Sequence, residues 1–303
     1  MPERQFLRPT TLIEARRLQK NLGLDLTIAS ETFQHTGSFK FRAAYNVAAN
    51  VDAGTILTAS SGNFGQALAY AASLLRKKAI VVMPETSARV KMDAVREHGG
   101  TVEPVDVRVK SRAERVEELH LQHPEAFVSS AYDHPLVIAG NASLGRELAP
   151  LDFDAVVVPV GGGGLSSGII QGLREAGNPR TRVVGAEPLL GNDAARSLAA
   201  GRIVRNESEP MTIADGARTV SLGEHNWAIL KDGIDSIVEV PEENIAQAVR
   251  LLFSLANLKA EPTGALGIGA LLTDPARFRD RRVCAVVTGG NVDPEIFQRL
   301  ISG

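Results

Sequence analysis

Residues 156–164 read Val156-Val157-Val158-Pro159-Val160-Gly161-Gly162-Gly163-Gly164. The apolar, β-branched run predicts a buried strand, and Leu165 with the helix-like residues 169–176 completes a strand-turn-helix unit. Glycines let an anion approach the main chain closely, and the N–H groups at a helix start favour a phosphate there. We therefore interpret Gly161, Gly162, Gly163 and Gly164 as a phosphate cradle. An ordinary tight turn is the alternative, although four glycines exceed what a turn requires.

The same unit is also similar to half of a dinucleotide-binding fold, because the next predicted strand, at residues 182–186, is followed by the acidic Glu187. The glycine spacing counts against this interpretation. Ser166 and Ser167 stand where the motif G-x-G-x-x-G requires its third glycine, and the nucleotide loop G-x-x-x-x-G-K-[ST] is absent from the sequence. A nicotinamide-dependent oxidoreductase is therefore the less favoured alternative.

Lys40 lies in the run Thr36-Gly37-Ser38-Phe39-Lys40-Phe41-Arg42. A polar, turn-forming segment precedes it and a helical pattern at residues 43–48 follows, so it lies near a strand-to-helix junction, where α/β proteins place their chemistry. Two flanking phenylalanines partly strip the lysine of water, which disfavours the ammonium form and leaves more free amine to attack carbonyls. We predict an imine-forming lysine, and a solvated lysine in a first helical turn is the alternative.

Two further segments carry polar groups at strand ends. Residues 58–66 read Thr58-Ala59-Ser60-Ser61-Gly62-Asn63-Phe64-Gly65-Gln66 and lead into an alanine-rich helix at residues 67–75. Their hydroxyls, amide and N–H groups suit a carboxylate, while an ordinary N-cap by Ser60 or Ser61 is the alternative. Residues 283–291 predict a buried strand that ends at Thr288 and two glycines.

Together these segments resemble the fold type II pyridoxal-phosphate enzymes, and within them the threonine/serine dehydratase and serine racemase branch. The resemblance covers nearly the whole chain, from Pro9-Thr10-Thr11-Leu12 to Thr288-Gly289-Gly290-Asn291. The motifs between these ends are Gly37-Ser38-Phe39-Lys40, Ser60-Ser61-Gly62-Asn63, Val82-Met83-Pro84-Glu85, Val137-Ile138-Ala139-Gly140, the glycine run, Thr212-Ile213-Ala214-Asp215-Gly216 and Glu261-Pro262-Thr263-Gly264-Ala265.

The resemblance implies pyridoxal 5'-phosphate as the cofactor and assigns its contacts to Phe39, Lys40, Asn63, Gly161, Gly162, Gly163, Gly164, Leu165 and Thr288. Lys40 would carry the Schiff base, Asn63 would bond the ring hydroxyl oxygen and Thr288 would face the pyridine nitrogen. A threonine there donates a hydrogen bond but no formal charge, which favours loss of a group from Cβ over transamination. The substrate carboxylate would lie on Ser60, Ser61, Gly62 and Asn63.

The activity that the resemblance implies is that of a dehydratase, or ammonia-lyase. It would eliminate water from a small β-hydroxy amino acid of threonine/serine or 3-hydroxyaspartate type, with Lys40 as the base, to give a 2-oxo acid and ammonia. Similar racemases use a serine at the position of Ser61, so a serine or other amino-acid racemase with Lys40 and Ser61 as its two bases is the alternative.

Two departures from the family pattern leave the substrate side chain open. Phe64 stands where histidine is usual, and residues 141–143 read Asn-Ala-Ser where Gln-Gly-Thr is common. If the substrate carries a second carboxylate, His134 or Arg218 is a candidate partner, with a surface role as the alternative for each.

The segment Glu187-Pro188-Leu189-Leu190-Gly191-Asn192-Asp193 is similar to the metal site of related enzymes. Glu187, the Gly191 carbonyl and Asp193 would supply oxygen ligands to Mg²⁺ or Ca²⁺. Helix capping is the alternative.

The expected architecture is α/β, a two-lobed fold type II enzyme (tryptophan synthase β-like) with mostly parallel sheets flanked by helices. A small substrate-loop domain, residues 51–135, would be inserted in a large cofactor-binding domain made of residues 1–50 and 136–303. Because the chain ends soon after Asn291, no added regulatory domain is expected.

Composition agrees with a small-molecule enzyme. The 303 residues carry a formal net charge of −2 without a basic cluster, which argues against nucleic acid or a membrane as a partner. No leader-like apolar segment opens the sequence, and the single Cys284 rules out an internal disulfide, so a reducing cytoplasm is expected. Family likeness implies a homodimer.

Overall fold

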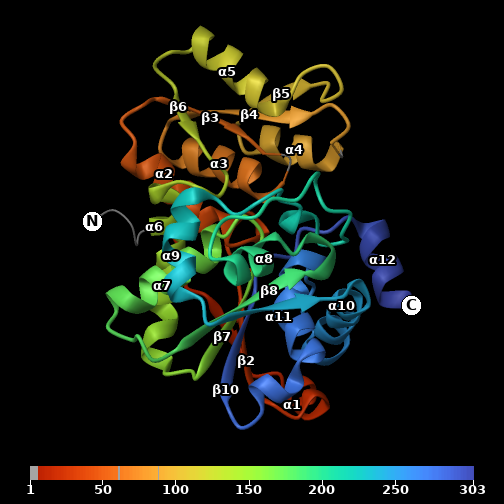
Figure 1. Ribbon diagram of the computed structural model, residues 1–303. Helices are drawn as coiled ribbons and strands as arrows, with labels where there is room; N and C mark the ends of the chain where they lie inside the picture. The colour runs from red at the N-terminus through yellow and green to blue at the C-terminus, as the bar shows by residue number, and fades with distance from the viewer. Residues whose placement is uncertain (1–5, 61, 88) are drawn as a thin grey trace.

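The computed structural model describes residues 6–60, 62–87 and 89–303, and it contains two sheets that lie one above the other in Figure 1. The larger sheet has six strands in the order β1-β2-β10-β7-β8-β9, where β1 is antiparallel to β2 and the other neighbours are parallel. In that order the strands are Thr11–Ile13, Asp25–Ser30, Arg282–Val287, Ala155–Pro159, Arg182–Pro188 and Ser236–Val240. The predicted α/β class with mostly parallel sheets is therefore confirmed.

The smaller sheet is parallel throughout and has the order β5-β4-β3-β6. Its strands are Thr101–Val105, Lys78–Pro84, Thr55–Ala59 and Phe127–Ser129, all within the predicted segment 51–135. Helix α2 (Lys40–Asn50) falls within the predicted large domain, yet its Phe41 and Tyr45 share a core with Phe64 of α3 (Asn63–Leu74). The division at residues 50 and 135 stays a prediction.

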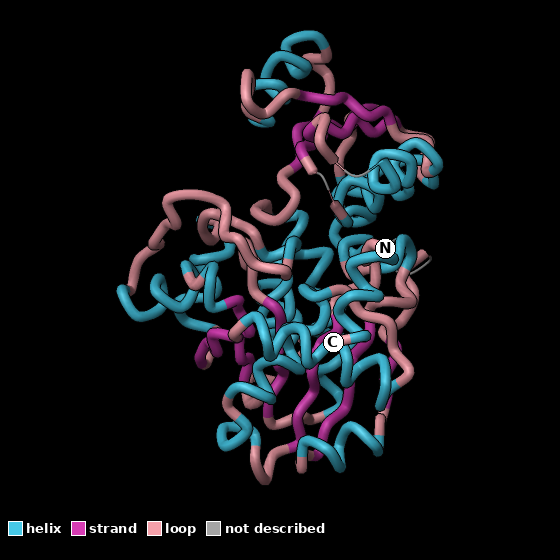
Figure 2. The backbone as a smooth tube through the Cα atoms, turned by 90° about the vertical axis from the view of Figure 1, so that its right-hand side faces the viewer, coloured by secondary structure: helices cyan, strands magenta, loops and turns pink. Residues whose placement is uncertain are grey.

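Helices cover both faces of each sheet and form the outer layers in Figure 2. One face of the larger sheet packs on α1, α10 and α11, and the other on α6, α7 and α9. The smaller sheet packs on α3 and α4 on one side and α5 on the other. In the described ranges the remaining helices are α1 (Arg16–Leu22), α4 (Arg89–Glu97), α5 (Arg112–Gln122), α6 (Pro135–Leu148), α7 (Gly164–Glu175), α8 (Asp193–Ala200), α9 (Glu224–Gly233), α10 (Glu242–Ala256), α11 (Pro262–Thr273) and α12 (Pro294–Ser302). The short 3₁₀ turns there are η1 (His35–Gly37), η2 (Ala149–Leu151), η3 (Leu189–Gly191), η4 (Asp215–Ala217) and η5 (Pro275–Phe278).

Two helices begin earlier than their sequence pattern predicts. Helix α7 starts at Gly164 and not near residue 169, and α3 starts at Asn63 and not at residue 67. The first turn of α7 is buried against its neighbours, so tertiary packing outweighs the low helix propensity of glycine and serine. Both helix starts therefore lie directly at strand ends, at the edge of the sheet where parallel α/β proteins bind ligands.

Candidate active site

Lys40 is the first residue of α2, and its turn is tied to the end of β10. Ser38 forms an isolated antiparallel bridge with Gly289, and the N–H of Phe39 donates to the Thr288 carbonyl at 2.9 Å. Thr288 is only 2% exposed. The fold therefore brings together Lys40 and Thr288, which lie 248 positions apart in the sequence.

The amine of Lys40 lies among apolar rings. Its Nζ is 5.1 Å from the centroid of the Phe39 ring and 5.8 Å from that of Phe64, and it donates a hydrogen bond to the Ala131 carbonyl at 2.9 Å. Burial lowers the pKa of Lys40 to about 8, and the negative field of Glu261 acts in the opposite direction. Roughly a tenth of such an amine is neutral at pH 7, against well under a thousandth for an ordinary lysine.

The glycine run follows β7 and opens α7, as predicted. Gly163 is the N-cap residue and has φ of +91°, a conformation that residues with a side chain rarely adopt. A Cβ added to Gly162 would come within 2.2 Å of the Tyr132 ring, so this ring packs directly on the run. The first N–H groups of α7 lack partners within the helix, which makes this turn suited to an anion.

Two buried asparagines hold the carbonyl groups of the glycine run. Asn226 donates through Nδ2 to the Gly162 carbonyl at 2.7 Å and to the Tyr132 carbonyl at 3.1 Å. Asn141 donates to the Gly164 carbonyl at 3.0 Å. Asn141 is one of the departures from the family pattern, and here it fixes the glycine run.

The predicted substrate loop lies between β3 and α3. Ser60 Oγ accepts hydrogen bonds from the N–H groups of Gly65 at 3.2 Å and Gly62 at 3.4 Å, so it satisfies an N–H of the first helical turn, although the N-cap residue of α3 is Gly62 and not Ser60. Gly62 precedes the helix and Asn63 begins it. Ser61 lies outside the described residues.

Asn63 joins this loop to two other parts of the chain. Its Nδ2 donates to Glu261 Oε1 at 2.8 Å, and its Oδ1 accepts from Asn291 Nδ2 at 2.8 Å. Glu261 is only 5% exposed, and burial, with a further contribution from Asp215, raises its pKa to about 8. Asn63, Glu261 and the end of β10 thus form one polar cluster beside Lys40.

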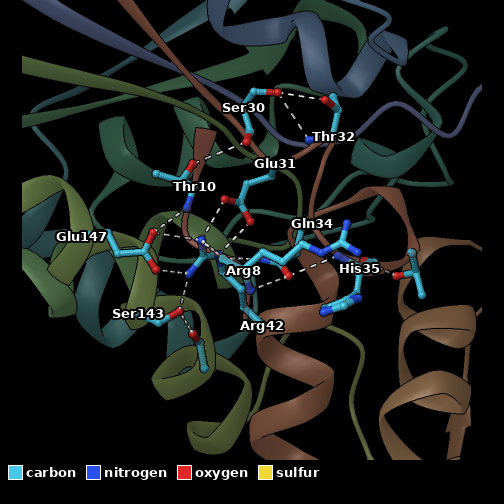
Figure 3. Close-up of polar contacts among 12 residues, drawn as sticks. Arg8, Thr10, Ser30, Glu31, Thr32, Gln34, His35, Arg42, Ser143 and Glu147 are labelled. Carbon is cyan, nitrogen blue, oxygen red and sulfur yellow. Dashed lines mark hydrogen bonds and ion pairs between the residues drawn. The ribbon is translucent and has the colours of Figure 1, made fainter. Parts of the chain in front are cut away.

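A buried ion-pair cluster lies next to the lysine turn and is drawn in Figure 3. Arg42, fully buried, donates to both oxygens of Glu31 at 2.7 and 2.9 Å and to both oxygens of Glu147 at 2.7 and 3.1 Å. Ser143 accepts from the same guanidinium at 2.9 Å. This cluster, which we call the Arg42 cluster, anchors the first turn of α2 to the end of β2 and to α6.

A family model described as "Pyridoxal-phosphate dependent enzyme" matches residues 3–289. The chain belongs to this family. The predicted cofactor is thereby confirmed as that of the family, and the nicotinamide-dependent alternative is set aside.

Relatives place this pyridoxal-phosphate-dependent enzyme more narrowly. It is 38% identical to an L-threo-3-hydroxyaspartate ammonia-lyase of Pseudomonas sp over 98% of this chain and 94% of the relative. It is 33% identical to the serine racemase of Schizosaccharomyces pombe over 99% and 94%. Among solved structures, a threonine deaminase from T.th. is 40% identical, with a TM-score of 0.90 over 95% of this chain and 94% of that one. The predicted dehydratase and racemase branch is confirmed.

The residues present fit pyridoxal phosphate. Lys40 has a lowered pKa, the glycine run forms a side-chain-free turn at a helix start, and the buried Ser38 hydroxyl has no hydrogen-bond partner among the described residues. The side chain of Leu165 is buried in the core, so its main-chain N–H is the group that suits a phosphate.

The two predicted metal ligands with side chains lie close together at the end of β8. Glu187 accepts from the N–H groups of Ala194 at 2.8 Å and Ala195 at 2.9 Å, as a helix cap would. Burial and the neighbouring Asp193 raise the pKa of Glu187 well above its ordinary value, and burial raises that of Asp193 to about 6. Asp193 Oδ2 is buried without a hydrogen-bond partner in the described part of the chain. Gly191 ends the short turn η3 between them.

Within residues 6–60, 62–87 and 89–303, no cluster of three or more His, Cys, Asp or Glu side chains is placed to hold a metal ion. Over the same ranges no helix has the length and apolar character that crossing a membrane requires.

Four residues of the site have no predicted role in the sequence: Glu261, Ala131, Tyr132 and Asn226. Glu261 belongs to a family motif, but a glutamate before a proline at a helix start is typical of a cap and by itself indicates no further role. Ala131 and Tyr132 lie in a loop without periodicity, and contacts across the fold alone place them. Asn226 follows Glu224 and His225 in the polar first turn of α9, so no local pattern distinguishes it from a solvated residue.

Proposed function

We propose that this chain is an ammonia-lyase that removes water from a β-hydroxy amino acid of the 3-hydroxyaspartate type. The observation that carries the proposal is Lys40, a partly buried amine with a pKa of about 8 beside the Ser60 and Asn63 loop. Relatives from Pseudomonas sp and Saccharomyces cerevisiae, 38% and 34% identical, are L-threo-3-hydroxyaspartate ammonia-lyases. A relative from Paracoccus denitrificans is a beta-hydroxyaspartate dehydratase at 36% identity.

In this proposal pyridoxal phosphate supplies the electron sink that makes the substrate Cα proton acidic. Lys40 Nζ takes this proton, since its pKa near 8 leaves a usable fraction of neutral amine. The main-chain N–H groups at the start of α3 hold the substrate carboxylate, and those at the start of α7 hold the cofactor phosphate. Thr288 donates a neutral hydrogen bond, which limits competing transamination.

The second carboxylate of such a substrate requires a cation, and Arg218 suits it better than His134. Arg218 is exposed and its Nε and Nη2 donate to the Thr212 carbonyl, at 2.8 and 2.6 Å. It follows Ala217, whose Cα is 3.1 Å from the position of a Cβ on Gly161, so it stands beside the glycine run. Burial lowers the pKa of His134, which favours its neutral form at pH 7.

A substrate panel tests the proposal. The purified enzyme, loaded with pyridoxal phosphate, is supplied separately with 3-hydroxyaspartate, threonine and serine, and 2-oxo acid and ammonia are measured. We expect the highest kcat/KM for 3-hydroxyaspartate, and Arg218→Ala should lower that value by about tenfold or more while changing serine turnover little. Equal turnover of serine and 3-hydroxyaspartate by the unchanged enzyme would contradict the assigned substrate.

Racemisation is the second candidate, supported by serine racemase relatives at 33–35% identity. It requires Ser61 as a base on the face of the substrate opposite Lys40. The Ser61→Ala variant separates the two activities, because it should abolish formation of the enantiomer and leave ammonia release. Loss of both activities together would show that Ser61 only binds substrate.

We also propose that Glu187, the Gly191 carbonyl and Asp193 hold Mg²⁺ or Ca²⁺. The support is the unpartnered Asp193 Oδ2, among the described residues, beside a second buried carboxylate, an arrangement that a divalent cation stabilises. After chelation, added Mg²⁺ at about 100 times its Kd should stabilise the protein by about 2.7 kcal/mol in denaturant unfolding. The Asp193→Asn variant should respond far less, and an equal response would exclude Asp193 as a ligand.

A homodimer is our proposal for the assembly, based on the likeness to the family. Sedimentation equilibrium at several protein concentrations tests it, because a dimer gives twice the mass of 32.3 kDa. A mass that stays at that of one chain would reject it.

A further inference from the structure

Glu261 lies between two residues assigned to the cofactor ring. It directly precedes α11, and its Oε1 accepts from Asn63 Nδ2 at 2.8 Å. On the other side it rests on the end of β10, since a Cβ added to Gly289 would come within 2.8 Å of the same Oε1. Gly289 follows Thr288, the residue predicted to face the pyridine nitrogen. The carboxyl group therefore bridges the helix start of α3 and the strand end of β10.

Among the residues that the structure describes, the hydrogen bonds of Asn63 leave one of its amide N–H groups free. Its Oδ1 accepts from Asn291 Nδ2 at 2.8 Å and from Gln66 Nε2 at 3.2 Å, which fills both lone pairs of that oxygen. One N–H of its Nδ2 is taken by Glu261. The second N–H is the group that a ligand can use, so this asparagine offers a ligand a donor and no acceptor.

We propose that Glu261 is a positioning residue for the cofactor, which holds the Asn63 amide in the one orientation that presents an N–H to the ring oxygen. The inference rests on the proposed function and on the contact between Asn63 and the cofactor ring oxygen that the family resemblance implies. Without Glu261 the amide can turn over and present its oxygen, which repels an electron-rich ring oxygen. Glu261 itself need not touch substrate or cofactor.

The charged groups around Glu261 influence its pKa and therefore its protonation state. Asp215 of η4 faces it with a negative charge, while Lys91 of α4 and Lys40 of α2 face it with positive charges. Burial and Asp215 outweigh the two lysines and Asn63, so that the pKa is raised to about 8 and the carboxyl group holds a proton at pH 7. A protonated carboxyl still accepts through its carbonyl oxygen, so Asn63 is oriented without a full negative charge beside the ring.

The first test measures binding of pyridoxal phosphate to cofactor-free protein by absorbance titration. Glu261→Ala and Asn63→Ala should each raise Kd about tenfold, the size expected for one hydrogen bond to a polar ligand. The double variant should bind no more weakly than Asn63→Ala alone, because the first residue acts through the second. Glu261→Gln should stay within about threefold of the unchanged protein, since its amide oxygen can still accept.

The second test uses the cofactor-free protein alone and follows its free energy of unfolding against pH. A carboxyl whose pKa rises from 4.5 to about 8 on folding stabilises the protein fully below pH 4.5, and this stabilisation is lost as the pH rises to about 8. Glu261→Gln should remove this part of the pH dependence. Thr273→Val, at the far end of α11, is the matched control: it loses hydrogen bonds to Asn244 and Gly269 and should lower stability equally at all pH values.

Three outcomes overturn the inference. Unchanged Kd in Glu261→Ala rejects the positioning role, and so does a double variant in which the two effects multiply. If the pH dependence of unfolding is unchanged in Glu261→Gln, Glu261 is not a carboxyl group whose pKa is raised on folding. These failures differ from failure of the proposed function, which would appear as unchanged protein that does not bind pyridoxal phosphate or as bound cofactor without elimination.

Discussion

Lys40 and Arg42 are two basic residues on the first turn of one helix, and their surroundings shift their pKa values in opposite directions. Arg42 has no exposed surface, and although burial opposes its charge, contacts with the carboxylates of Glu31 and Glu147 raise its pKa and keep it charged. Lys40 has two aromatic rings and a carbonyl around Nζ, and burial lowers its pKa to about 8. Two positions along the helix separate a structural cation from a candidate catalytic amine.

The difference follows from what each side chain meets across the fold. A buried cation remains charged only when counter-charges and hydrogen bonds replace the water that it loses. Around Arg42, α6 and the end of β2 supply those partners. Around Lys40 the negative field of Glu261 opposes the effect of burial but does not outweigh it, because burial is the larger influence on the amine.

Replacing the amine should have the largest effect. Lys40→Ala removes the group that takes the Cα proton, and we expect turnover to fall by about a thousandfold or more. The same variant should lose the yellow absorbance of lysine-bound pyridoxal phosphate. Far-UV circular dichroism serves as the folding control, and a folded variant that keeps its colour would remove Lys40 from the site.

Replacing the guanidinium of Arg42 should lower the stability of the protein. Arg42→Met leaves Glu31 buried without its cation, which should cost about 3–5 kcal/mol in the free energy of unfolding. Denaturant unfolding measures the loss. The double variant Arg42→Met with Glu31→Leu should recover part of it, because no unpaired buried charge remains at that position. A loss below about 1 kcal/mol would show that Arg42 is not the structural cation that buried Glu31 requires.

The rate of cofactor uptake should follow the ionisation of Lys40. Because only the neutral amine attacks an aldehyde, uptake of pyridoxal phosphate by cofactor-free protein should rise about tenfold per pH unit and level off above pH about 8. Stopped-flow absorbance measures this rate. A plateau that begins only above about pH 10 would show that Lys40 has the pKa of an ordinary lysine, and the proposed effect of its surroundings would then be wrong.

The smallest effect should come from an exposed ion pair of similar geometry. Arg146 and Glu175 are 2.6 Å apart with both side chains more than a third exposed. Arg146→Ala should change the free energy of unfolding by less than about 1 kcal/mol, because water replaces the lost partner. If this variant were as damaging as Arg42→Met, burial would not explain the importance of the Arg42 cluster.

Much of the scaffold could be predicted because it depends on local pattern. The β-branched run before the glycines, the strand that ends at Thr288 and the alternation of strands with helices all appear where expected. The start of α7 does not follow from the sequence pattern, since glycine and serine have low helix propensity and packing against α6, α9 and the Tyr132 loop compensates for it. Glu261 was missed as a partner of Asn63 because a separation of 198 positions carries no local signal.

The sequence by itself determined the chemical groups of this protein: an amine between phenylalanines, a glycine turn after a buried strand and the family motifs that join them. The tertiary structure alone decided their ionisation and orientation. A pKa depends on the water that a group loses and the charges that it meets, and both come from segments distant in the chain. That is why Lys40 and Arg42, nearly adjacent in sequence, differ so much in the fold.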